Sequence, residues 1–286
     1  MTMLAFTKRN ILIYFRDKVA VFFSLFAVLI LIALYVLFLA DLTAEAIPEF
    51  PSKNALLISW FISGILAVTS MTTTLGAFGI LVEDLANKRN LDFYAAPIPR
   101  AKLVGGYILC AIFVGVFMCV ITFVIADIYL VTNGFGFLSF RKTLIILALI
   151  ILSVFASGSM VLFIISFLRT SNAFSAVSMI IGTLLGFLAG IYIPIGNFPD
   201  YLQLIVKLFP VSHSVALFRQ VLMESYLVEA FTNAPMGIKE TFELDMGVFY
   251  EIGGKHISML SSVIYLILTT ISFFALSLLI MKKKRN

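Results

Sequence analysis

Charged residues are scarce in this chain of 286 residues: only 12% are Asp, Glu, Lys or Arg, whereas 62% are hydrophobic. Soluble domains contain about a quarter charged residues and about half apolar residues. A folded soluble protein needs a polar exterior, which this composition cannot supply. The composition therefore excludes a soluble enzyme, a disordered chain and a disulfide-rich secreted module, and it indicates a polytopic membrane protein.

Cysteine and histidine are also scarce, with two residues of each. Cys110 and Cys119 are nine positions apart in one apolar run, which places them ~13 Å apart along a helix, too far for a disulfide. His213 and His256 are distant from both in the sequence. We therefore expect no metal site and no cofactor bound by this chain.

Motifs that carry enzyme chemistry are missing. The sequence has no GxxxxGK[ST] phosphate-binding motif and no HExxH motif, and the apolar runs hold no pair of acids and no Ser/His pair. Asp127 is the only acid inside an apolar run, close to its end, where it is either interfacial or part of an ion pathway. We expect no catalytic residue, so ATP with Mg would bind to a separate ATPase chain.

Six apolar runs have the ~20 residues that a helix needs to cross the hydrocarbon core. They predict an all-α polytopic membrane protein with six transmembrane helices in one domain of residues 1–286. The runs are Val19–Ala40, Ala55–Val82, Leu103–Val131, Thr143–Leu168, Ala173–Ile195 and Ile257–Met281.

The distribution of charge predicts the orientation. Six crossings put both termini on one side, which carries 13 of the 20 basic residues and four of the 15 acidic residues, a net charge of +9 against −4 on the other side. Basic residues accumulate on the cytoplasmic side, so both termini are predicted to be cytoplasmic. Because the basic residues lie at the ends of apolar runs, nucleic acid is not an expected partner.

Two further segments are predicted to lie at or within the membrane without crossing it. Residues 1–18 form an amphipathic helix, whose apolar face includes Tyr14 and whose opposite face carries Arg9 and Arg16; such a helix lies in the membrane surface. Residues 196–223 hold two short apolar runs broken by Pro210. We expect them to form a helical hairpin that enters the outer leaflet and returns, followed by an external loop that ends at residue 256.

Small residues recur at helical spacing along the fifth predicted span. They form one stripe, along which membrane helices can approach closely. The stripe is a subunit interface, the wall of a conduit, or a packing surface within one bundle. Its members are Ser171, Ser175, Ser178, Gly182, Gly186 and Gly190.

The cytoplasmic loop of residues 83–102 combines charges with an apolar patch. Leu91, Phe93 and Tyr94 are exposed anchors of the kind that dock a protein partner. Lys88, Arg89 and Arg100 would surround them and set the orientation. The alternative is a linker that rests on lipid headgroups.

Three residues of the predicted outer hairpin are candidates for a gate: Pro210, His213 and Arg219. A charge at that depth needs a partner. We expect Glu224 or a lipid phosphate to pair with Arg219, unless its side chain extends to the headgroups.

Several short motifs follow one another along the chain. They are Asp92-Phe93-Tyr94 leading into Ala96-Pro97-Ile98-Pro99-Arg100, then Gly106-Tyr107-Ile108-Leu109, then Gly182–Gly190 leading into Tyr192-Ile193-Pro194-Ile195-Gly196, and Phe209-Pro210-Val211-Ser212-His213 with Arg219-Gln220.

In these motifs the chain resembles the membrane subunit of the ABC-2 type exporters, the family of bacterial drug, peptide and polysaccharide ABC permeases. The resemblance implies an elbow helix before the first span, a coupling helix between spans two and three, and re-entrant helices before span six. It also implies a dimer of permeases over two ATPase subunits. Lys88-Arg89-Asn90 departs from the glycine-containing run of many relatives.

Two classes of function follow. The first is the permease subunit of an ATP-driven exporter in the bacterial plasma membrane, moving an amphipathic drug, a peptide or a lipid-like molecule, as a homodimer or a related heterodimer. The second is a membrane immunity or sensory subunit that does not transport and binds a peptide through its outer loop.

Overall fold

Backbone polar groups in a bilayer cannot bond to water, so a crossing segment satisfies them within a helix. The computed structural model, which describes residues 2–35, 37, 52–89, 99–168, 170–232, 235 and 237–283, accordingly forms long helices from the apolar runs. They are α1 (Met3–Arg16), α2 (Lys18–Leu34), α4 (Lys53–Ala86), α6 (Arg100–Thr132), α7 (Phe140–Ile165), α8 (Ser171–Leu188) and α13 (Met259–Lys283).

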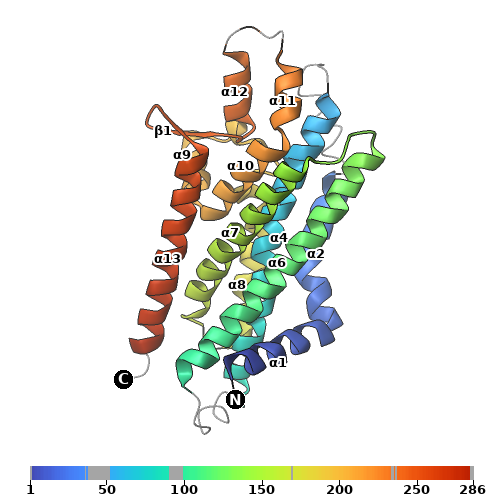
Figure 1. Ribbon diagram of the computed structural model, residues 1–286. Helices are drawn as coiled ribbons and strands as arrows, with labels where there is room; N and C mark the ends of the chain where they lie inside the picture. The colour runs from blue at the N-terminus through green and yellow to red at the C-terminus, as the bar shows by residue number, and fades with distance from the viewer. Residues whose placement is uncertain are drawn as a thin grey trace.

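Five of these helices, α4, α6, α7, α8 and α13, are long and apolar enough to cross a membrane. Helix α2 covers the first predicted span up to Leu34, and most of the rest of that span lies outside the described residues. Helix α1 and the C-terminal end of α13 lie at the same end of the molecule, and α1 runs across that end of the bundle (Figure 1). Both features agree with an even number of crossings.

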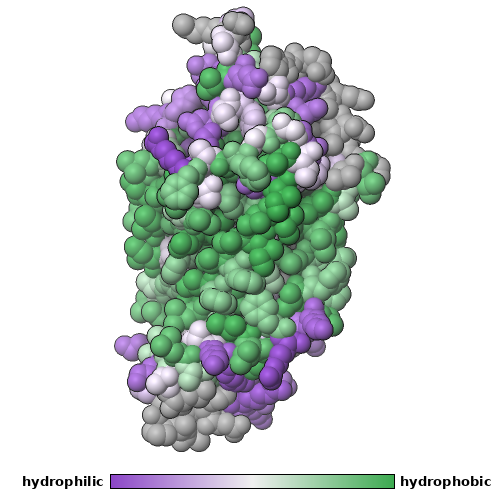
Figure 2. All heavy atoms as spheres, turned by 45° about the vertical axis from the view of Figure 1, so that its right-hand side comes forward, coloured by the Kyte–Doolittle hydropathy of each residue, from purple (hydrophilic) through white to green (hydrophobic). Residues whose placement is uncertain are grey.

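The surface confirms a multi-pass membrane protein. Figure 2 shows a band of hydrophobic side chains around the middle of the molecule, with hydrophilic side chains above and below it. Large apolar residues within the band are exposed, for example Met179, whose side chain is 74% exposed. A soluble protein would bury such residues, whereas lipid tails solvate them.

Helix α4 is the axis of the bundle. In the most apolar stretch of α4, 89% of the residues are buried, whereas the corresponding share is 11% in α8 and 11% in α13. Its hydroxyl side chains bond back to the helix, as Thr69 does to the carbonyl of Ile65 at 2.8 Å, and Ser70 pairs with Ser157 of α7 at 2.9 Å. A Cβ atom at Gly115 of α6 would lie 2.9 Å from Thr74, so the lack of a side chain there lets α4 and α6 pack closely.

Helix α8 ends earlier than the sequence predicts. The fifth span was expected over Ala173–Ile195, but the helix stops at Leu188 because Gly190 adopts a left-handed backbone with φ of +59°. The amide of Gly190 bonds to the carbonyl of Phe187, and that of Ile191 bonds to the carbonyl of Gly186. This is the Schellman termination that glycine favours, so Gly190 caps the helix rather than extending its stripe.

The outer segment breaks at Pro210. Helices α9 (Asp200–Leu208) and α10 (Pro210–Leu222) are bent by 86° to each other. Phe209 between them is extended, as a residue before proline usually is, and Pro210 occupies the favoured first position of a helix. The break was predicted, but the two arms form an L rather than an antiparallel hairpin.

The predicted external loop contains regular structure that the sequence did not predict. It holds α11 (Glu224–Ala230), α12 (Ile238–Asp245) and strands β1 (Tyr250–Ile252) and β2 (Lys255–Ile257), whereas the short helix η2 (Ile195–Asn197) lies before α9. The strands are antiparallel, with Tyr250 opposite Ile257. Gly253 and Gly254 both have positive φ in the turn, the conformation that favours glycine in two-residue hairpins. Among the described residues, this hairpin is the only sheet, and the other regular elements are helices.

Candidate functional site

A large cavity of about 1020 Å³ lies between α1, α2, α4 and α8. One wall is the face of α4 that carries Val68, Thr72 and Leu75, and the opposite wall is α8. The lining is mostly apolar, with aromatic rings such as Phe23 and Phe174. Its volume is at the upper end of the range of ~300–1,000 Å³ that is typical of pockets for small molecules.

The small residues of α8 have different surroundings in the structure. Ser178, Gly182 and Gly186 line the cavity, whereas Ser175 is exposed. A Cβ atom at Gly182 would meet open space, but one at Gly186 would overlap the ring of Tyr192 in the same chain. The hydroxyl of Ser178 is buried and has no hydrogen-bond partner in the described part of the chain. Part of the stripe thus faces the cavity, and part of it packs within the subunit.

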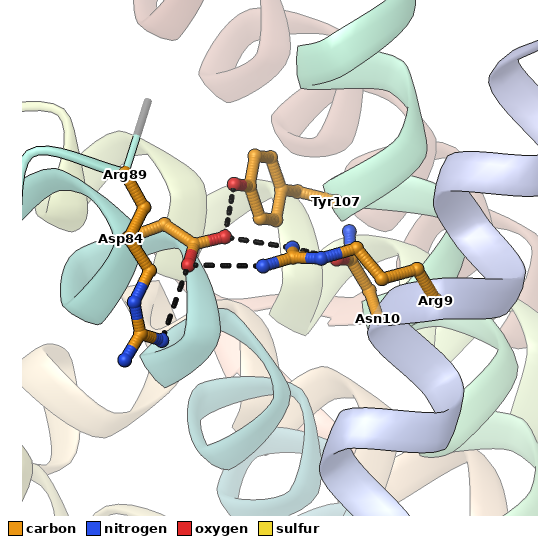
Figure 3. A network of polar contacts seen from close by, with 5 residues as sticks. All are labelled: Arg9, Asn10, Asp84, Arg89 and Tyr107. Atoms are coloured by element: carbon orange, nitrogen blue, oxygen red, sulfur yellow. Dashed lines mark hydrogen bonds and ion pairs between the residues drawn. The ribbon is translucent and has the colours of Figure 1, made fainter. Parts of the chain in front are cut away.

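A network of polar side chains joins the helices at the end of the molecule that holds α1 (Figures 1 and 3). Its centre is Asp84 in the last turn of α4, whose side chain is only 2% exposed. Arg9 of α1 donates two hydrogen bonds to the two carboxylate oxygens, at 2.8 and 3.3 Å. Tyr107 of α6 donates a third at 2.6 Å, and a guanidinium nitrogen of Arg89 lies 3.7 Å away. The carboxylate therefore ties α1, α4, α6 and the start of the predicted cytoplasmic loop together.

Close packing supports this network. The rings of Phe6 and Tyr107 meet edge to face with centroids 5.0 Å apart. A Cβ atom at Gly106 would lie 2.6 Å from the Phe6 ring, so only glycine allows α1 to pack this closely against α6. This network was not predicted from the sequence, where Asp84 is only one of the four acids on the predicted cytoplasmic side. Its position was a signal, because Asp84 follows Ala77 and Ile80 by seven and four residues and so shares the buried face of α4.

The predicted docking anchors are only partly placed. Leu91, Phe93 and Tyr94 lie outside the described residues, as does the side chain of Arg100. Lys88 has a left-handed backbone with φ of +56° directly after the end of α4, and the side chain of Arg89 is 56% exposed. Of the predicted set, only Arg89 is seen to join a network, through Asp84.

A second cluster of polar contacts surrounds a buried cation at the other end of the bundle. Arg219 of α10 is 1% exposed. It donates to the carbonyls of Met246 and Gly190 at 2.8 and 2.9 Å, with Gly247 and Ala189 further away at 3.4 and 3.5 Å. Its guanidinium stacks over the ring of Trp60 at 4.7 Å from the centroid.

The expected partners of Arg219 were wrong. Glu224 pairs instead with Lys142 at 3.2 Å, and burial of Arg219 keeps it away from lipid phosphates. Carbonyls at the C-terminal end of α8 carry a partial negative charge, and the indole ring is a further site for a cation. Trp60 also donates to the carbonyl of Met246 at 2.8 Å. Together these contacts join α4, the end of α8, α10 and the segment after α12.

His213 holds α10 to its other neighbours. Its Nε2 lies 2.9 Å from the carbonyl of Lys207, and its Nδ1 lies 3.2 Å from the hydroxyl of Ser262 in α13. The ring also lies beside the rings of Tyr250 and Tyr265. A neutral imidazole satisfies both contacts, with Nε2 donating and Nδ1 accepting. Pro210, at the start of the same helix, sets the break that brings His213 back over Lys207.

Comparison of the sequence with known proteins identifies the family of this chain. No curated protein sequence is similar enough to this chain to be named as a relative. The family model described as ABC-2 type transporter matches residues 2–223, which include α1, the cavity walls, Asp84 and Arg219. The chain therefore belongs to the ABC-2 type transporter family.

Proposed function

We propose that this chain is the membrane-spanning permease subunit of an ATP-driven exporter that moves an amphipathic drug, peptide or lipid-like molecule out of a bacterial cell. The observation that carries the proposal is the apolar cavity of about 1020 Å³ beside the weakly buried helix α8. A cavity with apolar walls and a few hydroxyl groups suits amphipathic cargo. ATP and Mg would bind to a separate ATPase subunit, and both termini would face the cytoplasm.

A second permease copy would complete the cavity. Ile180 and Leu184 of α8 are exposed, and Met179, which lines the cavity, is exposed beside them. We therefore place the partner copy, identical or related, against α8, so that two cavities meet across the interface.

The network around Asp84 would transmit movement from the ATPase. In this proposal, two ATPase copies dock on the cytoplasmic loops of the permease pair, through Phe93 and Tyr94, and α1 lies in the membrane surface as an elbow helix. A push on the loop would reach Asp84 through Arg89, and Asp84 would pass it to α1 and α6. Rigid contacts of this kind are needed because hydrolysis and transport take place on different chains.

The L-shaped pair of helices α9 and α10 would close the transport pathway on the outer side. Helix α10 is buried along nearly its whole length, and broken backbone at membrane depth is tolerated where protein covers it. We propose that α9 and α10 form a re-entrant element, and that Arg219 and His213 hold it against α8 and α13 when the outer gate is shut.

Reconstitution with the ATPase tests the proposal. The permease and an ABC ATPase encoded next to it would be purified together in proteoliposomes, and ATP turnover and export would be measured with a panel of amphipathic cargos. Cargo should stimulate turnover, and Gly182→Trp should abolish the stimulation by filling the open cavity. Ile271→Trp is the control, because Ile271 is exposed on α13 and lies outside the cavity lining. Failure of every cargo to stimulate turnover would refute the exporter function.

One observation favours the second candidate function, a subunit that binds a peptide from outside. A polar pocket of about 270 Å³ lies in the outer layer and is lined by Gln203, Lys207, Asp245 and Glu251 among others. Peptide binding at this pocket without any ATPase partner would support that function instead.

A further inference from the structure

The charged residues of the cavity wall are acidic, whereas the cytoplasmic side as a whole is basic. We infer that the cavity selects organic cations with bulky apolar groups, and that Glu83 binds their positive charge. The inference rests on the proposed function, because it names the class of cargo for the same cavity.

The lining has one sign of charge. Asp17, between α1 and α2, and Glu83, in the last turn of α4, both line the cavity, and no Lys, Arg or His lines it among the residues that the structure describes. The cytoplasmic side carries a net charge of +9 by the sequence count, with only four acids. Two of these four acids thus line the cavity, although the side as a whole is strongly basic.

The neighbouring acids of α4 have different roles. Asp84 faces α1 and α6, where Arg9 and Tyr107 satisfy it. Glu83 is turned toward the cavity, since it follows Gly76 and Gly79 by seven and four residues on the face that lines it. Glu83 is exposed and forms no ion pair with a described residue. Its carboxylate therefore remains available to a ligand.

The rest of the lining suits the apolar part of such a ligand. Rings of Phe23, Phe26 and Phe174 line the same space and can pack on apolar groups or on a delocalised cation. The buried hydroxyl of Ser178 is free to bond a polar group of the cargo. Apolar walls strengthen the attraction between a carboxylate and a cation by lowering the local dielectric. An anion of the same shape gains from the walls but is repelled by the Glu83 carboxylate.

Two ions of nearly equal shape and opposite charge test the inference. The full-length chain in lipid nanodiscs would be dialysed against tetraphenylphosphonium or tetraphenylborate, with empty nanodiscs subtracted. We expect saturable binding of the cation and no saturable binding of the anion. Glu83→Gln should weaken cation binding roughly 3- to 10-fold, and Glu83→Lys should abolish it. Because Glu83 is exposed, both variants should fold.

Glu240→Gln is the matched control, since Glu240 is an exposed acid of α12 far along the chain and outside the cavity lining. It should bind the cation as the unmodified chain does. Equal binding of the two ions, binding of neither ion, or full cation binding by Glu83→Gln would overturn the inference.

The permease function is tested separately from the charge selection. Export of a neutral cargo at the same rate by the unmodified chain and Glu83→Gln, without selective binding of the cation, would retain the exporter and remove the charge selection. Cation binding that depends on Glu83, without any stimulation of ATP turnover, would retain the selective site and remove the exporter.

Discussion

The ion pair between Arg9 and Asp84 should act as a single unit, so that removing both partners does less harm than the sum of the two single changes. Arg9→Gln leaves a carboxylate that is 2% exposed without its main donor. Removing one partner of a buried pair costs about 3–5 kcal/mol. Because Arg9 is itself 25% exposed and Tyr107 still donates to Asp84, we expect the lower end, about 3 kcal/mol.

The reverse change should be milder. Asp84→Asn keeps the shape and one acceptor, and it leaves a guanidinium that solvent partly reaches, so we expect a loss of about 2 kcal/mol. The double variant should lose about 3 kcal/mol rather than the 5 kcal/mol of independent sites, a coupling energy of about 2 kcal/mol. Contacts between neighbouring charged residues are commonly non-additive by this amount.

Thermal unfolding of the purified chain in nanodiscs measures the cycle. A change of 1 kcal/mol shifts the Tm of a chain of this order of size by about 2–4 °C. Arg9→Gln and the double variant should therefore both unfold at least about 6 °C below the unmodified chain. Arg16→Gln, an exposed position at the end of the same helix, is the control and should shift Tm by less than about 1 °C. Additive losses in the double variant would refute the reasoning, as would an Arg9→Gln variant as stable as the control.

Three further predictions concern the contacts of Arg219, the small-residue stripe of α8 and the loop of residues 83–102. Arg219→Met should lower Tm by several degrees and shift the fluorescence emission of the chain's single tryptophan, because four carbonyls lose their donor and the indole loses its cation. Unchanged emission would contradict the contact between Arg219 and Trp60. Gly186→Leu should destabilise the subunit by colliding with a ring of the same chain, whereas Gly182→Leu should fold and lower cargo-stimulated turnover; size-exclusion profiles and turnover assays separate the two, and equal behaviour would contradict the structure. Replacing Phe93 and Tyr94 together by alanine should cost ~2 kcal/mol or more of ATPase binding and abolish co-purification while the permease still folds; a complex that survives would show that another segment docks the ATPase.

The apolar runs alone predicted the helical membrane fold. A run of about 20 apolar residues has few alternatives to a helix in lipid, because the backbone must satisfy its own hydrogen bonds. The break at Pro210 was also readable, since proline lacks an amide and restricts the residue before it. The early end of α8 also has a local cause, but glycine can either allow close helix packing or end a helix. Gly190 was interpreted as a packing residue, whereas its φ of +59° shows that it ends the helix.

The partners of the buried charges were decided by the tertiary structure. Arg9 and Asp84 are 75 residues apart in the chain, and no periodicity relates them. Arg219 was expected to need an acid or a phosphate, but it binds backbone carbonyls, which every residue carries and which the sequence therefore cannot single out. Likewise, the face of α4 that holds Glu83 became a cavity wall because α8 packs weakly beside it. Local hydrogen bonding and hydrophobicity determine which segments are helices, whereas the pairing of charges and the position of open space depend on how those helices pack.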